Sequence, residues 1–230
     1  MIPKHVAIVL DGNRRFAKRL MLDPRKGHEF GQKKVEELLT WSKELGIKEL
    51  TFYTFSIQNF NRPKEEFDYL MNLIIKAFTR FCTDPRIEEN KIRVNVIGRY
   101  DLFPKDVKDA IVNIIDKTKN NDGFIVNFAM AYGGREELTD AVKKIALEIS
   151  QGKLKPEDIT ETLIQKHLYM ESEPDIIIRT GGEKRTSNFL MWQSYYSEWF
   201  FLDKMWPEFT KEDLVNVIKE FEQRERRFGK

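Results

Sequence analysis

Five short apolar runs alternate along the chain with longer segments of helical periodicity. The runs are rich in β-branched and aromatic residues and occupy 6–10, 50–55, 92–97, 124–131 and 176–178. Near-continuous runs of this kind are typical of parallel strands covered on both faces. Apolar residues at three- and four-residue steps predict helices at 29–45, 65–82, 104–119, 134–151, 156–169 and 210–226. This alternation predicts an α/β fold with a central, mostly parallel β-sheet flanked by helices and joined by right-handed crossovers.

Length and composition favour one domain. The chain has 230 residues, of which 41% are hydrophobic and 12% aromatic, and these can fill one large core. The sequence contains no internal repeat, no low-complexity tract and no Gly/Ser-rich linker that would mark a boundary. We therefore expect residues 1–230 to form a single domain.

The charge balance and the single cysteine exclude several classes of protein. The 39 basic and 37 acidic residues give a net charge of +2, so the chain lacks the strong overall positive charge that is typical of nucleic-acid-binding proteins. Cys82 stands alone, which rules out an intrachain disulfide and a cysteine-based zinc site. No apolar stretch approaches the ~18 residues of a membrane span, and the run at 6–10 is too short for a signal peptide. We expect a cytoplasmic protein that could lie peripheral to a membrane.

A polar loop, Asp11-Gly12-Asn13-Arg14-Arg15, follows the first predicted strand directly. In open α/β sheets, ligands bind beyond the carboxyl ends of the strands. Asp11 offers a hard oxygen ligand for Mg²⁺, and Gly12 allows the backbone to approach a ligand closely. Asn13 offers amide donors, and Arg15 offers a fork that matches phosphate oxygens. The loop therefore indicates a metal-diphosphate site, although Asp-Gly-Asn is also common turn chemistry.

Two further loops follow predicted strands. The loop 179–187 combines three cations, two glycines and three hydroxyls, as expected for a diphosphate cradle. A solvated charged loop is the alternative. The loop 56–63 mixes polar donors with an aromatic ring, which suits a phosphate head joined to an apolar tail. It could equally be only the entry to the next helix.

The predicted helix 65–82 carries an unusually wide apolar stripe. Its members are Phe67, Leu70, Met71, Leu73, Ile74, Ile75, Phe78 and Phe81. A core helix is the simpler interpretation. The stripe has more apolar face than one core contact requires, so a helix that also walls an apolar tunnel is the alternative. The strand 124–131 and Thr54 are candidates for the opposite wall and the mouth of that tunnel.

Two isolated titratable residues leave their roles open. Glu198 lies within the aromatic stretch 194–201, where a buried acid needs a partner, either a metal ion or an arginine. His28 is a lone histidine, and such residues are more often structural than catalytic. Several motifs are absent: the P-loop, the dinucleotide-binding glycine motif, the nucleophile elbow and the DDxxD aspartates of trans-type prenyltransferases. A phosphatase of the haloacid dehalogenase type is a weak alternative, because its motif needs an aspartate where Asn13 stands.

Taken together, these loops resemble those of the cis-prenyltransferase family, of the undecaprenyl diphosphate synthase type. The resemblance runs nearly end to end, in blocks that include 11–13, 27–28, 55–56, 59–63, 132–135, 178–183, 187–193, 206–207 and 224–229. It implies an enzyme that condenses isopentenyl diphosphate onto an allylic primer, farnesyl or geranylgeranyl diphosphate. The implied product is a long-chain cis-polyprenyl diphosphate such as undecaprenyl diphosphate, which partitions to membranes. The resemblance also implies a Mg²⁺ cofactor and a homodimer.

The same resemblance assigns roles to individual residues. Asp11 would bind the magnesium ion, with Glu198 as a second ligand. Asn59 would help to remove the proton. The remaining substrate contacts would come from Gly12, Asn13, Arg14, Arg15, Phe16, Arg25, His28, Ser56, Phe60, Arg62, Arg179, Arg185, Thr186 and Ser187. Arg227 and Gly229, in the C-terminal motif, would reach the neighbouring active site of a dimer.

The chain departs from the family pattern at a few positions. Phe16 and Phe60 stand where the family often has tryptophan, so an apolar ring is kept and an N–H donor is lost. Pro24 replaces a usual arginine, and Arg25 could substitute for it. Lys184 replaces what is often histidine. Non-catalytic partner subunits of heteromeric prenyltransferases also resemble the family, but they lose the Asp-Gly-Asn loop that is intact here.

Overall fold

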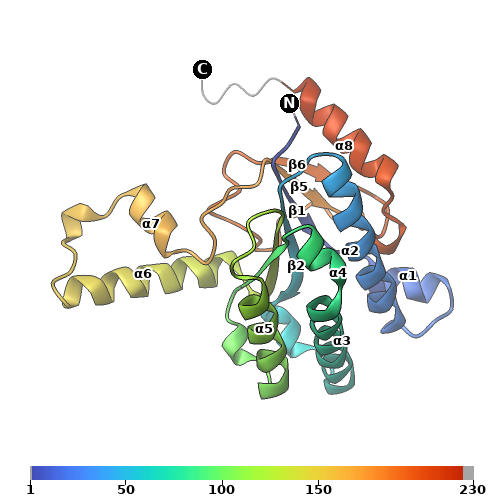
Figure 1. Ribbon diagram of the computed structural model, residues 1–230, viewed down its shortest axis with the longest axis horizontal. Helices are drawn as coiled ribbons and strands as arrows, with labels where there is room; N and C mark the ends of the chain where they lie inside the picture. The colour runs from blue at the N-terminus through green and yellow to red at the C-terminus, as the bar shows by residue number, and fades with distance from the viewer. Residues whose placement is uncertain (1, 225–230) are drawn as a thin grey trace.

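Six parallel strands form one sheet in the order β3-β4-β2-β1-β5-β6 (Figure 1). The computed structural model describes residues 2–224. The strands are β1 (His5–Val9), β2 (Glu49–Ser56), β3 (Arg93–Ile97), β4 (Ile125–Tyr132), β5 (Ile176–Arg179) and β6 (Glu198–Phe201). The first strand, β1, is therefore central, and its neighbours β2 and β5 come from distant parts of the chain. The predicted α/β fold with a parallel sheet is confirmed.

Helices cover mainly one face of this sheet. The helices are α1 (Asn13–Arg19), α2 (Lys26–Glu44), α3 (Lys64–Thr83), α4 (Pro85–Glu89), α5 (Lys105–Thr118), α6 (Gly134–Ser150), α7 (Glu161–His167) and α8 (Lys211–Gln223). The apolar sides of α2, α3, α5 and α8 pack with alternate strand residues such as Ile8, Phe52 and Phe128 into the main core. The helical predictions for these four segments agree with the structure to within a few residues at each end.

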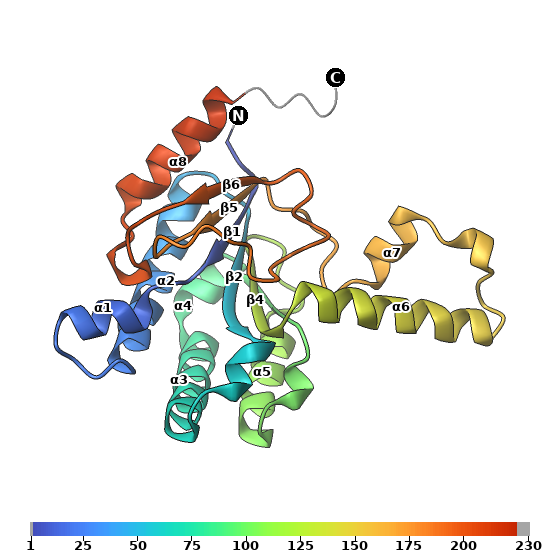
Figure 2. The same ribbon diagram turned by 180° about the vertical axis from the view of Figure 1, so that it is seen from behind.

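The other face of the sheet is closed by loops rather than by a layer of helices. Tyr53, Ala129 and Ile177 pack there against Met170 and Phe189. Helix α6 and the segment carrying α7 project sideways from the body of the molecule, opposite the side on which α1 lies (Figure 2). None of the helices within residues 2–224 is both long and apolar enough to cross a membrane.

Four local elements differ from the sequence prediction, and one of them is the five-residue helix α4, which was not predicted. The helix predicted at 156–169 is instead a 3₁₀ turn, Pro156–Asp158, followed by α7. The break arises because the Thr160 hydroxyl accepts a hydrogen bond from the backbone N–H of Leu163 and starts a new helix. The short edge strand β6 and the helix α1 were not predicted either. Their four and seven residues are too few to show the alternating apolar pattern of a strand or the three- to four-residue pattern of a helix.

Close packing of α1 on α2 requires glycine at position 27. A Cβ atom added there would lie 1.9 Å from the backbone carbonyl oxygen of Asn13. A backbone atom cannot move aside as a side chain can, so α1 and α2 would have to separate.

Gly27→Ala should therefore destabilise the protein by about 1–3 kcal/mol, the usual cost of overpacking. Lys33→Ala, an exposed change on the same helix, is the matched control and should change stability little. Chemical denaturation of the two variants and the parent chain makes the comparison. Equal midpoints for Gly27→Ala and the parent would contradict this account of the α1–α2 contact.

Candidate active site

Three loops meet at the carboxyl edge of the sheet. Val9 of β1 pairs with Tyr53 of β2 on one side and with Arg179 of β5 on the other. The loops that begin at Asp11, Ser56 and Thr180 consequently emerge next to one another. This is the edge at which the three sequence loops were expected to lie.

A polar cavity of about 330 Å³ opens between the first of these loops and α2. Four cationic side chains reach it, and Asp11 is the one acid among its lining residues. The lining consists of Leu10, Asp11, Gly12, Asn13, Arg14, Arg15, Lys18, His28 and Arg62. We call it the outer cavity. Its excess of positive charge suits a polyanion such as a diphosphate.

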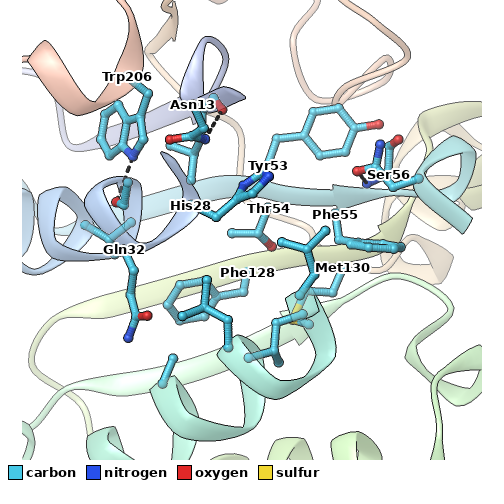
Figure 3. Close-up of a pocket in the computed structure, with 18 of the residues that line it drawn as sticks. Asn13, His28, Gln32, Tyr53, Thr54, Phe55, Ser56, Phe128, Met130 and Trp206 are labelled. Carbon is cyan, nitrogen blue, oxygen red and sulfur yellow. Dashed lines mark hydrogen bonds between the residues drawn. The ribbon is translucent and has the colours of Figure 1, made fainter. Parts of the chain in front are cut away.

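A second cavity, of about 310 Å³, continues from the outer one into the protein (Figure 3). The two share Leu10, Asp11, Asn13, His28 and Arg62. This inner cavity then runs between the sheet and α3 and becomes largely apolar. Its deeper wall consists of Val35, Phe55, Leu70, Leu73, Ile74, Ala77, Phe78, Phe81, Phe128 and Met130. Thr54 lines it as well, so β2 and β4 supply the wall opposite α3.

Asp11 lies at the junction of the two cavities. One carboxylate oxygen, Oδ1, accepts the Gly12 N–H at 2.7 Å and an Arg15 N–H at 3.1 Å. The other, Oδ2, accepts an Arg179 N–H at 2.9 Å. Gly12 adopts φ +104°, and a Cβ atom there would lie 2.8 Å from Met205 Cβ, so the loop requires glycine for both reasons.

Arg179 joins the first loop to the loop that follows β5. Its side chain is almost completely buried, and besides Asp11 it donates to the Ser187 hydroxyl at 2.7 Å and to the Arg185 carbonyl oxygen. The Arg185 side chain points to solvent and pairs with Glu183, and Thr186 is exposed. Arg179 therefore shapes both loops, whereas Arg185 is free to reach an incoming anion.

The loop after β2 forms a 3₁₀ turn, Ile57–Asn61, that fixes Asn59. The Asn59 side-chain oxygen accepts the backbone N–H of Ser56 at 3.0 Å, and Asn59 lines the inner cavity. Arg62, at the end of the turn, pairs with Glu66 at 2.6 Å and lies 3.5 Å from the His28 ring.

His28 is uncharged in this setting. Burial, together with the nearby Arg62 guanidinium, lowers the pKa of His28 to about 4. At neutral pH the ring therefore acts as a hydrogen-bonding group and adds no charge to the outer cavity.

The sequence analysis missed some residues that line or support the two cavities. Lys18 adds a fourth cation to the outer cavity, and Glu66 holds Arg62 and also lies 3.6 Å from Arg14. The four-residue step from Arg62 to Glu66 could have signalled this pair. Gln32 and Trp206 line the inner cavity, and Trp206 donates to the Gly31 carbonyl oxygen at 2.9 Å.

Six of the expected substrate contacts line neither cavity: Phe16, Arg25, Phe60, Arg185, Thr186 and Ser187. Phe16 packs edge-on against Phe30, with ring centres 5.4 Å apart. Phe60 belongs to an aromatic cluster with Phe55 and neighbouring rings. Arg25 pairs with Asp23 and Glu65 outside the cavities. Arg227 and Gly229 lie outside the described residues.

The predicted position of Glu198 needs a correction. Glu198 is the first residue of β6 and pairs in register with Ile176, which in turn pairs with Val6. It therefore lies toward the amino edge of the sheet, whereas Asp11 follows Val9 at the carboxyl edge. Its carboxylate pairs with Arg224 at 2.5 Å, the arginine alternative considered above. Asp11 and Glu198 of one chain thus lie at opposite edges of the sheet, and binding of a metal ion by Glu198 stays a prediction.

The residues at the cavity junction still fit a divalent cation. Within residues 2–224 there is no group of three or more His, Cys, Asp or Glu side chains that could hold a metal by themselves. Asp11 offers one carboxylate, and the buried Asn13 Oδ1 has no hydrogen-bond partner. Mg²⁺ commonly takes one or two carboxylates and completes its shell with substrate phosphates and water. The donor set therefore suits an ion held between Asp11 and a bound diphosphate.

Comparison with known proteins gives a consistent picture. Residues 9–229 match the model of the family described as "Putative undecaprenyl diphosphate synthase". The tritrans,polycis-undecaprenyl-diphosphate synthase (geranylgeranyl-diphosphate specific) of Pyrococcus horikoshii is 52% identical over 232 residues, covering 100% of this chain and 88% of the relative. The isoprenyl transferase of Thermus thermophilus is 47% identical over 235 residues, covering 100% of this chain and 89% of the relative.

Solved structures agree with these relatives. Lavandulyl diphosphate synthase from Lavandula x intermedia, in complex with dimethylallyl diphosphate, superposes with a TM-score of 0.95 at 35% identity and covers 100% of this chain and 99% of its own. A "probable undecaprenyl diphosphate synthase" from Campylobacter jejuni gives 0.82 at 32% identity, with 99% of each chain covered. The chain belongs to the undecaprenyl diphosphate synthase family of cis-prenyltransferases, enzymes that condense isopentenyl diphosphate onto an allylic diphosphate.

Proposed function

We propose that residues 1–230 form one catalytic domain that uses Mg²⁺ to build a long-chain cis-polyprenyl diphosphate, such as undecaprenyl diphosphate. The name of the Pyrococcus horikoshii relative specifies geranylgeranyl diphosphate, which favours that primer here. The observation that carries the proposal is the direct opening of the cationic outer cavity into the apolar inner cavity at Asp11, His28 and Arg62. A diphosphate head and a prenyl tail need these two environments side by side.

The two rival functions are less well supported. A phosphatase of the haloacid dehalogenase type needs a second acid where Asn13 stands, and it has no use for a deep apolar cavity. A non-catalytic partner subunit would lack an intact Asp-Gly-Asn loop. Turnover by the purified protein alone separates both from the proposal.

The first chemical step is loss of the allylic diphosphate. The C–O bond breaks, and its electron pair leaves with the diphosphate. Arg14, Arg15, Lys18 and Arg62 face the outer cavity, so they can stabilise the charge that develops there. A bound Mg²⁺ ion would supply further charge neutralisation between Asp11 and the diphosphate. The apolar walls keep water from the allylic carbon, which would otherwise be hydrolysed.

The second step joins the two substrates. The alkene of isopentenyl diphosphate attacks the allylic carbon, a C–C bond forms, and a proton leaves. Arg185 and Ser187 are exposed in the loop after β5, and the contact of Ser187 with Arg179 supports a role for this loop in holding the second diphosphate. Asn59 can orient a substrate through its amide, but an amide is a poor base. A diphosphate oxygen is the better proton acceptor, which also balances the charge of the leaving group.

We also propose a homodimer. The α6–α7 projection supports this, because Val142 and Leu147 of α6 are exposed apolar side chains on it. The expectation that Arg227 and Gly229 complete a neighbouring site belongs to the same proposal.

Replacement of Asp11 tests the metal-diphosphate site. Asp11→Ala should lower turnover by roughly 10²–10³-fold or more, by analogy with the loss of one charge-stabilising group. Asp11→Asn keeps an oxygen for the buried Arg179 and should lose comparable activity with less effect on stability. Asp23→Ala, a nearby exposed acid, is the matched control. Steady-state rates at saturating Mg²⁺ provide the measurement, and near-normal rates for Asp11→Asn would refute the site.

Replacement of Arg185 tests the second diphosphate position. Arg185→Ala should raise the KM for isopentenyl diphosphate about tenfold or more, because a lost charge-assisted hydrogen bond of ~1.5–3 kcal/mol corresponds to at least that factor. The KM for the primer should change little. Lys153→Ala, an exposed cation outside this loop and outside both cavities, serves as the control. Arg179→Ala should raise the same KM, although it also removes the partner of Asp11. A change confined to the primer KM would show that the two substrates are assigned the wrong way round.

Phe81 is the best candidate for the floor of the inner cavity. Among the described residues it alone lines both the inner cavity and a separate cavity of about 430 Å³ that lies between the ends of α2 and α3, near Ile92 and Phe124. Its ring is buried against Phe128, with centres 6.1 Å apart. A chain that grows inward would meet this ring last.

Opening this floor should lengthen the product. Phe81→Leu, and more strongly Phe81→Ala, should shift products to longer chains because the tail can enter the second cavity. Ile74→Trp, midway along the wall, should shorten them. Phe67→Ala is the matched control, since Phe67 belongs to α3 but does not line the inner cavity. Mass spectrometry of the products gives the chain lengths. If all variants and the parent give the same distribution of product chain lengths, α3 is an ordinary core helix and does not form a tunnel wall.

A further inference from the structure

Three consecutive large apolar side chains are exposed in the turn that joins α1 to α2. Leu20, Met21 and Leu22 are 47%, 96% and 42% exposed, and Phe30 of α2 adds a fourth at 37%. The turn projects from the body of the molecule beside the label α1 (Figures 1 and 2). We call these four residues the α1–α2 tip. Clustered exposed apolar side chains of this kind commonly mark an interaction surface.

The folded chain itself gains nothing from methionine at the end of this tip. Met21 adopts φ +57°, a conformation that residues other than glycine, asparagine and aspartate rarely adopt. Its side chain is almost fully exposed, so it buries no apolar surface within the chain. Asparagine or glycine would fit the turn better. The methionine therefore points to a contact that lies outside the described chain.

Positive charge surrounds the tip. Between residues 14 and 30 the sequence has six cationic and two acidic side chains. Arg19 lies over the Phe16 ring at 5.6 Å and pairs with Glu208, and Lys26 pairs with Glu29, yet about half of each cationic side chain is exposed. Lys18 is exposed as well and lines the outer cavity. An apolar projection ringed by cations is complementary to an anionic lipid surface, which offers phosphates outside and hydrocarbon within.

We propose that the α1–α2 tip docks the enzyme on an anionic lipid bilayer. Leu20, Met21 and Leu22 would enter the boundary between headgroups and acyl chains, while Lys18 and Lys26 lie at the level of the phosphates. Apolar insertion and basic charge together are the two signals that stable peripheral binding requires. Docking here brings the outer cavity close to the bilayer, because Lys18 stands two residues before Leu20 and also lines the outer cavity. The inference rests on the proposed function in one respect only: that function explains why docking is useful, because an apolar product must be delivered to the bilayer.

Cosedimentation with vesicles tests the tip directly. The full chain, without substrate, should bind phosphatidylcholine vesicles that contain about one third phosphatidylglycerol, and bind pure phosphatidylcholine far less. Added salt should weaken the binding. Leu20→Ser/Met21→Asn should reduce binding about tenfold or more, because apolar surface no longer enters the bilayer. Asparagine at position 21 suits the left-handed turn, so the fold should be retained.

A matched variant separates this surface from exposed apolar residues in general. Leu102→Ser/Val112→Asn removes two side chains that are 57% and 46% exposed on another part of the molecule, and it should bind vesicles like the parent. Turnover of the tip variant in detergent should be unchanged. Equal binding by the tip variant and the parent, or no binding of the parent to anionic vesicles, would overturn the proposal. Since the vesicle assay needs no turnover, its failure is distinct from a failure of the proposed enzyme activity.

Discussion

The buried guanidinium of Arg179 is the interaction on which the site depends. A buried charge is tolerated only when it is paired and hydrogen-bonded, and Arg179 satisfies this through Asp11, Ser187 and the Arg185 carbonyl oxygen. These partners belong to the loops after β1 and β5. The ion pair therefore fixes the distance between the two loops that are proposed to hold the two diphosphates. It also orients Asp11 so that its other oxygen faces Arg15 and the outer cavity.

Much of this arrangement could be predicted from the sequence, because it follows from strand order alone. Polar loops after parallel strands must meet at one edge, so Asp11, Ser56 and Thr180 were expected together. The Asp11–Arg179 contact could not be predicted, since it depends on the pairing of β1 with β5 across 168 residues. The position of Glu198 relative to Asp11 could not be predicted for the same reason. Its aromatic neighbours indicated that it needs a partner, which is Arg224, but the side chain is only partly buried, and only the register of β6 reveals that it starts at the opposite edge.

The apolar stripe of α3 shows a second limit of sequence reasoning. Positions in a core and positions that line a tunnel both require apolar side chains, so the periodicity of apolar residues cannot distinguish one from the other. In the structure Leu73, Ile74 and Ala77 line the inner cavity, whereas Phe67 and Met71 pack elsewhere in the core. Phe60 and Phe16 show that a sequence position next to the site does not ensure that the side chain lines it. Both stand in loops or helices next to the site and still turn their rings toward other aromatic side chains.

The location of Phe81 at the far end of the inner cavity separates two properties of the enzyme in space. If each condensation takes place near Asp11, as proposed, the earliest isoprene unit always leads and is the first to reach the ring. The catalytic groups do not contact that ring, which belongs to the opposite end of α3 from Arg62 and Glu66. Natural variation at the closed end can therefore change how long the lipid becomes while the chemistry of each addition stays the same. Enzymes with one shared reaction centre could diversify in this way by a few substitutions in a hydrophobic wall.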